Sequence, residues 1–163
     1  MYLTTSLLLS LFSIVFAAPT PTSSSAVAAA ASAKNVYLST CTTRSLLTDE
    51  VSSSAILFSG PAASTQPTDI GTVSPLNAIP WAGATWRARL DSGIFESRIA
   101  AGADALAKSE IAGTARLNRG ELIEEFVCFR DGGSTFRFAA GVLGEGQETS
   151  VCVAEYWCGS IGV

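Results

Sequence analysis

The sequence contains no histidine. This absence excludes Ser-His-Asp and Cys-His catalysis, and it removes imidazole as a ligand for zinc or copper. It also removes the one side chain whose ordinary pKa lies close to neutral pH, so no imidazole base is present. We therefore expect a protein that is not an enzyme and that holds no metal and no cofactor.

Positive charge is also scarce. Lys and Arg number 10 against 14 Asp and Glu, which gives a formal net charge of −4. No stretch gathers the basic residues that would follow a phosphate backbone, so a nucleic acid partner is not expected. Beyond the N-terminus no apolar run approaches the ~18 residues that a membrane helix needs, so no membrane span is expected.

Carboxylates form only one cluster, which consists of Glu121, Glu124 and Glu125. A glycoside hydrolase needs two carboxyl groups roughly 5–10 Å apart in a cleft. The cluster is more typical of a charged loop before a strand that starts at Phe126, so a carboxylate-based hydrolase is only a third hypothesis. The acidic loops also lack the alternating Asp and Asn spacing of a calcium site.

The N-terminus has the pattern of a secretory signal. Residues 1–17 combine an apolar core with a small-residue pattern at its end, and this core is too short to span a bilayer. Residues 18–34 are rich in Ala, Ser, Thr and Pro, which predicts a disordered leader. We expect a secreted, extracellular protein whose residues 35–163 form a single β-rich domain.

All four cysteines, Cys41, Cys128, Cys152 and Cys158, lie in the predicted domain. An even number of cysteines in a secreted chain indicates two disulfides. In one regular strand Cys152 and Cys158 would be about 20 Å apart, whereas a disulfide tolerates at most ~7 Å. This favours two long-range bridges that join Cys41 and Cys128 to the C-terminal pair. The alternative, Cys41–Cys128 with Cys152–Cys158, stays open.

Short stretches of alternating apolar and polar residues recur along the chain, separated by Gly or Pro turns. This pattern predicts an all-β fold, an antiparallel sandwich or barrel stapled by disulfides. The expected strands cover residues 36–41, 54–59, 70–73, 85–90, 94–99, 110–117, 126–130, 135–139 and 151–157.

Two turns in this pattern predict hairpins. Asp91-Ser92-Gly93 joins strands 85–90 and 94–99, and Asp131-Gly132-Gly133 joins strands 126–130 and 135–139. One helix of about two turns is possible over residues 100–108, although Gly102 lowers its propensity.

Aromatic residues on the surface of a β domain could stack on sugar rings. Trp86 and Trp157 share faces with apolar residues and are predicted in the core. Trp81, next to Pro80, and Tyr156 are the candidates for a surface platform. Arg87 and Arg89 alternate with the apolar face of their strand and could form a small basic patch, although an ordinary solvent-exposed face paired with Glu96 would have the same pattern.

Several segments together resemble a group of small secreted cysteine-containing proteins of filamentous ascomycete fungi. They are the segments around Cys41 (NVYLSTCTTR), around Trp81 and Trp86 (IPWAGATW), residues 111–117 (IAGTARL), the segment around Cys128 (FVCFRDG) and residues 152–158 (CVAEYWC). The similarity spans most of residues 35–158. The resemblance implies secretion and an effector or cell-surface role, and it supplies no catalytic residue.

These observations lead to two functional hypotheses. The first is a fungal effector-like virulence protein that binds a host or extracellular protein, without catalysis and as a monomer. The alternative is a module that binds cell-wall polysaccharide through Trp81 and Tyr156.

Overall fold

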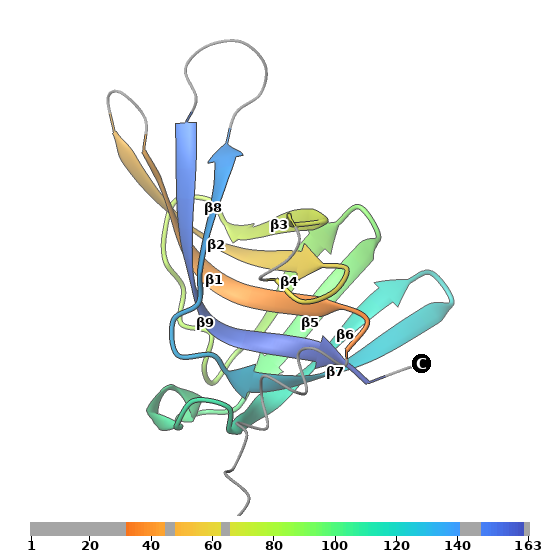
Figure 1. The fold of residues 1–163 in the computed structure, drawn as a ribbon. Helices are drawn as coiled ribbons and strands as arrows, with labels where there is room; N and C mark the ends of the chain where they lie inside the picture. The colour runs from red at the N-terminus through yellow and green to blue at the C-terminus, as the bar shows by residue number, and fades with distance from the viewer. Residues whose placement is uncertain (1–31, 45–47, 63–65, 141–147, 162–163) are drawn as a thin grey trace, which may run out of the picture.

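A computed structural model describes residues 32–44, 48–62, 66–140 and 148–161. The predicted signal and most of the predicted leader lie outside these residues. The described chain is almost entirely antiparallel β-structure, which confirms the predicted fold class (Figure 1). Its strands are β1 Asn35–Arg44, β2 Asp49–Phe58, β3 Asp69–Ser74, β4 Thr85–Leu90, β5 Gly93–Ile99, β6 Ile111–Arg119, β7 Leu122–Arg130, β8 Thr135–Ala140 and β9 Glu148–Ser160.

One sheet in the order β3-β2-β1-β9-β7-β6-β5-β4 curves into a nearly closed barrel. The two end strands, β3 and β4, complete the circle by close packing. Gly71 makes this possible, since a Cβ there would lie 2.7 Å from the Arg89 carbonyl oxygen. The Asp91 N–H also donates to the Asp69 carboxylate at 2.6 Å across this seam. Among the described residues no helix is long and apolar enough to cross a membrane.

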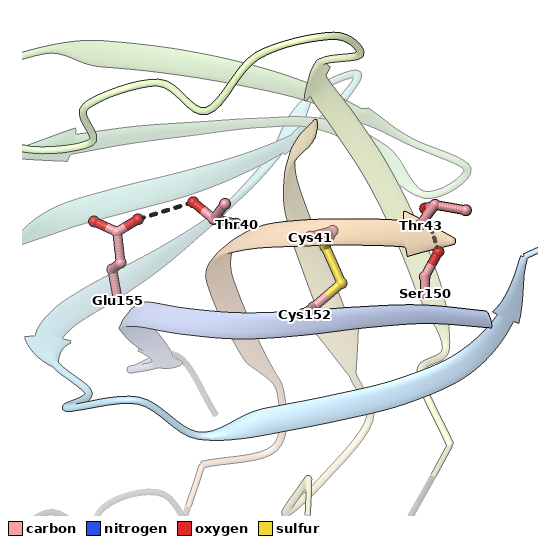
Figure 2. Close-up of a disulfide and its surroundings, with 6 residues drawn as sticks. All are labelled: Thr40, Cys41, Thr43, Ser150, Cys152 and Glu155. Atoms are coloured by element: carbon pink, nitrogen blue, oxygen red, sulfur yellow. Dashed lines mark hydrogen bonds between the residues drawn. A yellow bond between two sulfur atoms is a disulfide. The ribbon is translucent and has the colours of Figure 1, made fainter. Parts of the chain in front are cut away.

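Strand β9 carries one residue more than β1 can pair. Leu38 lies opposite Tyr156, and the next residue, Ser39, lies opposite Ala154, so Glu155 has no partner in this register. Such an extra residue is a β-bulge, which bends the strand and shifts every later side chain to the other face. The Glu155 carboxylate accepts a hydrogen bond from Thr40 Oγ1 at 3.1 Å (Figure 2).

The bulge explains the disulfide pairing. Cys152 and Cys158 would face the same side of a regular strand, because alternate residues share a face. With Glu155 inserted between them, Cys152 lies on the outer face and bonds to Cys41, while Cys158 faces the barrel interior and bonds to Cys128. The prediction of two long-range bridges is confirmed, and the local Cys152–Cys158 alternative is wrong.

The bulge also separates two hydrophobic cores. The larger core fills the barrel and includes Leu38, Phe95, Phe126 and the Cys128–Cys158 bridge. The smaller core lies outside, where the sheet bends, and is built on the Cys41–Cys152 bridge. Its aromatic members are Tyr37, Phe58, Phe129, Phe136, Phe138 and Trp157.

The predicted hairpin at Asp131-Gly132-Gly133 is wrong. Strands β7 and β8 do not pair with each other: β7 pairs with residues 156–160 of β9, and β8 pairs with residues 148–153. The turn instead carries the chain from one half of β9 to the other. Asp131, which is buried, holds this turn by accepting from the N–H groups of Gly133 and Ser134 and from the Ser134 hydroxyl.

Of three other local predictions, one hairpin is confirmed, and the structure differs from the expected helix and from the expected acidic loop. The hairpin of β4 and β5 is confirmed, and its two strands pair from Thr85 with Arg98 to Leu90 with Gly93. The possible helix over residues 100–108 shrinks to a 3-10 turn at Ala103–Ala105. Glu124 and Glu125, predicted in a loop, belong to β7, which forms a hairpin with β6.

Deletion of Glu155 tests the role of the bulge. Without this residue Cys152 and Cys158 would face the same side of β9, so the two native disulfides could not both form. We expect free thiols or a non-native bridge, detected by thiol titration and by mass spectrometry of the unreduced peptides. The substitution Glu155→Ala keeps the extra residue and should keep both bridges. Native pairing in the deletion variant would contradict this explanation.

Candidate functional site

Four arginine side chains share the outer surface of three adjacent strands. Arg87 and Arg89 lie on β4, Arg98 on β5 and Arg116 on β6, and all four are exposed. The alternation of β4 places them there, because Ala88 and Leu90 point into the barrel. We call this surface, formed by Arg87, Arg89, Arg98 and Arg116, the arginine face.

A row of side chains with alternating charge, which we call the charge row, crosses the arginine face. The strand register places Arg87 opposite Glu96, Glu96 opposite Arg116, and Arg116 opposite Glu125. Glu96 accepts from Arg87 Nε at 2.6 Å and from Arg116 Nη2 at 2.8 Å. Glu96 thus forms ion pairs with two arginines and positions both side chains.

The environment of Glu96 keeps its carboxylate charged. The Glu96 side chain is only 8% exposed, and burial alone would raise its pKa. The hydrogen bond from Arg87 and the positive charges of Arg116 and Arg87 prevail, so the pKa of Glu96 lies below its ordinary value of 4.5. Glu96 is therefore ionised at neutral pH.

Arg89 and Arg98 make no ion pair with any described residue. A small cleft of about 150 Å³ separates Arg98 from Arg116 and Glu125. The four arginines of the face stand against two carboxylates, Glu96 and Glu125, which leaves a net charge of +2 there. The whole chain carries −4, so charge of opposite sign is concentrated on this side of the barrel.

Trp81 is not on the surface, contrary to the sequence-based expectation. It is 1% exposed and belongs to the barrel core. Its segment runs beside the end of β5, where Ala82 bridges to Ile99, and this directs the indole inward. Trp86 lies over the same segment and donates from its Nε1 to the Pro80 carbonyl oxygen at 2.8 Å.

Tyr156 is buried as well, and the bulge is the reason. The shift at Glu155 turns Tyr156 into the barrel, where it is 0% exposed, and turns Trp157 outward against Phe129 in the smaller core. Burial raises the pKa of Tyr156. Neither Trp81 nor Tyr156 is therefore available for an exposed sugar-binding platform.

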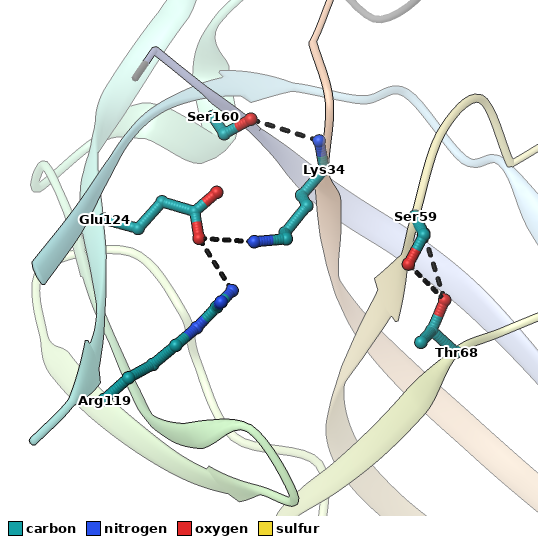
Figure 3. Close-up of polar contacts among 6 residues, drawn as sticks. All are labelled: Lys34, Ser59, Thr68, Arg119, Glu124 and Ser160. Carbon is teal, nitrogen blue, oxygen red and sulfur yellow. Dashed lines mark hydrogen bonds and ion pairs between the residues drawn. The ribbon is translucent and has the colours of Figure 1, made fainter. Parts of the chain in front are cut away.

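The acidic cluster does not form a catalytic pair. Glu124 and Glu125 are consecutive on β7 and so face opposite sides of the sheet. Glu124 is held by Lys34 and Arg119, each at 2.7 Å (Figure 3). This ion-pair group joins the start of β1 to the β6–β7 hairpin, together with a hydrogen bond from the Lys34 N–H to Ser160 Oγ. Glu121 lies exposed in the turn of that hairpin.

Sequence reasoning missed one group of aromatic rings. Tyr37, Phe58 and Phe136 come from β1, β2 and β8 and contact one another on the outer face. The alternation of Phe136 and Phe138 indicated one apolar face on β8, but no local signal showed that β8 packs beside β1 and β2.

Within the described residues, no group of three or more Cys, Asp or Glu side chains is placed to hold a metal ion. Comparison of the chain with known protein families, characterised proteins and solved structures finds no match. The site is therefore argued from its geometry.

The substitution Glu96→Gln tests the charge row. Loss of the carboxylate leaves Arg87 and Arg116 without their shared partner, so we expect the free energy of unfolding at pH 7 to fall by about 1–2 kcal/mol. Because the folded pKa is lowered, the stabilisation by Glu96 is present above pH 4.5 and is lost as the pH falls through that folded pKa. The difference between variant and wild type should therefore narrow on acidification below pH 4.5.

Urea denaturation over a pH series measures both effects. Glu125→Gln, at the exposed end of the same row, is the matched control and should change stability little. A Glu96→Gln variant as stable as wild type at pH 7 would contradict the assigned role of Glu96.

Proposed function

We propose that this protein is a secreted, non-catalytic binding protein whose arginine face recognises an acidic surface on a host or extracellular protein. The observation that carries the proposal is the concentration of exposed Arg87, Arg89, Arg98 and Arg116 on a chain of net negative charge. Arginine is enriched at protein interfaces, where its planar group pairs with carboxylates through two hydrogen bonds.

The charge row makes the arginine face better suited to binding. Arg87 and Arg116 are held by Glu96, so part of their side-chain entropy is already lost before a partner arrives. Arg89 and Arg98 lie on either side of the row and have no ion pair with a described residue to give up. Positioned and unpaired arginines are thus combined on one rigid sheet.

Secretion is supported by the chemistry of the cysteines. Both disulfides tie β9 to another strand, and such bonds persist in oxidising compartments. Together with the signal pattern of residues 1–17, this favours an extracellular protein. The resemblance to small secreted fungal proteins favours an effector-like role, in which the partner belongs to the host.

Polysaccharide binding remains the alternative hypothesis, but the two aromatic residues that were predicted to bind sugar rings are not exposed. Trp81 and Tyr156 are both buried. An acidic polysaccharide could still be attracted by the arginine face through charge alone, and it is therefore included in the test.

The double substitution Arg89→Gln and Arg98→Gln tests the proposal. Soluble poly-L-glutamate serves as a probe for an acidic protein surface, and its binding is measured by calorimetry at low ionic strength. Each exposed ion pair contributes about 0.2–1 kcal/mol, so the double variant should bind between about twofold and thirtyfold more weakly. Added salt should weaken wild-type binding, because exposed charges are screened.

Arg44→Gln is the matched control, since Arg44 is an exposed arginine outside the arginine face. It should bind poly-L-glutamate like the wild type. Equal binding by the double variant and the wild type would refute the proposal. Binding to polygalacturonate but not to poly-L-glutamate would favour the polysaccharide alternative instead.

A further inference from the structure

A second concave region lies on the outer side of the sheet, away from the arginine face. It is a pocket of about 560 Å³ between β8 and the described residues Ala62, Gln66 and Pro67, which follow β2. This volume falls within the range of about 300–1,000 Å³ that small-molecule sites occupy. We call it the aromatic pocket, after the rings of Tyr37, Phe58 and Phe136 that line it.

The three rings form a preorganised apolar surface. The Phe136 ring centre lies 4.8 Å from that of Tyr37 and 5.1 Å from that of Phe58, and Tyr37 meets Phe58 edge to face at 5.5 Å. Tyr37 and Phe58 are buried, while Phe136 is half-buried and is the most exposed of the three rings that line the pocket. A flat ring can pack against such a cluster in the offset or edge-to-face arrangements that aromatic groups prefer.

The polar groups around these rings favour an anion. Arg137 lines the pocket and makes no ion pair with a described residue, and no carboxylate is among the described residues that line the pocket. Gln66 lines the same pocket. The carboxylate of Asp131, whose charge acts on Tyr37, accepts hydrogen bonds from Gly133 and Ser134.

Tyr37 contributes a hydroxyl that stays protonated. Its burial, together with the negative charge of Asp131, raises the pKa of Tyr37 to about 12. At any pH near neutrality this hydroxyl is therefore a neutral group that can donate a hydrogen bond, and it does not repel an anion.

We propose that the aromatic pocket binds a small aromatic carboxylate, with the ring against Phe136 and Tyr37 and the carboxylate on Arg137. The site is separate from the arginine face, so either proposal can fail without the other. Arg137 also belongs to β8, and it follows Phe136, so alternation starts its exposed side chain on the opposite face of the strand. Because β8 is an edge strand, this side chain can turn around the free edge of β8 to reach a carboxylate in the pocket that Arg137 lines.

Calorimetry with 2-naphthoate tests this proposal, and 2-naphthylmethanol serves as the neutral analogue of the same ring. We expect 2-naphthoate to bind and the alcohol to bind at least about tenfold more weakly, as a charge-assisted hydrogen bond to arginine warrants. Arg137→Gln should lower the affinity for 2-naphthoate by about tenfold and leave that for the alcohol unchanged.

Two further variants test whether binding depends on the position of Arg137 and on the aromatic rings of the pocket. Arg44→Gln removes another exposed arginine of the same sheet and should bind 2-naphthoate like the wild type. Phe136→Leu should weaken both ligands, and near-ultraviolet circular dichroism checks that this variant is folded. Absence of 2-naphthoate binding, equal binding of the two ligands, or an unchanged affinity in Arg137→Gln would each overturn the proposal.

Discussion

The rest of the structure depends on the extra residue at Glu155. One unpaired position in β9 reverses the alternation of its side chains, so that Cys152 and Cys158 lie on opposite faces of the sheet. Each cysteine then lies directly opposite its partner, Cys41 or Cys128, on a neighbouring strand. A single local irregularity thus allows one strand to carry one disulfide inside the barrel and one on the outer face of the sheet.

The same irregularity organises the surface. The bend in β9 lets β7 and β8 pair with different halves of one strand, and the smaller core collects where the sheet turns. The aromatic pocket lies at this bend, with Tyr37, Phe58 and Phe136 from three strands. The arginine face lies on β4, β5 and β6, whose pairings are regular around Glu96, so its charges keep a simple cross-strand register.

Where side-chain alternation is regular, the sequence was a good guide to the site. Arg87 and Arg89 were placed correctly on the outer face of β4, because Ala88 and Leu90 between them are apolar. Tyr156 was misplaced because the alternation of β9 breaks one residue earlier. Trp81 was misplaced because its loop is directed by a bridge to Ile99, a contact that neighbouring residues do not encode.

The sequence by itself determined the absence of imidazole chemistry, the all-β class and the presence of two disulfides, since these follow from composition and from period-two alternation. Only the tertiary structure decided which cysteines pair, which aromatic rings are buried and which strands are neighbours. The physical reason is that register describes how two strands are aligned with each other, so it cannot be read from the sequence of either strand alone. The unpaired position of Glu155 exists only relative to Leu38 and Ser39, which lie more than a hundred residues earlier in the sequence.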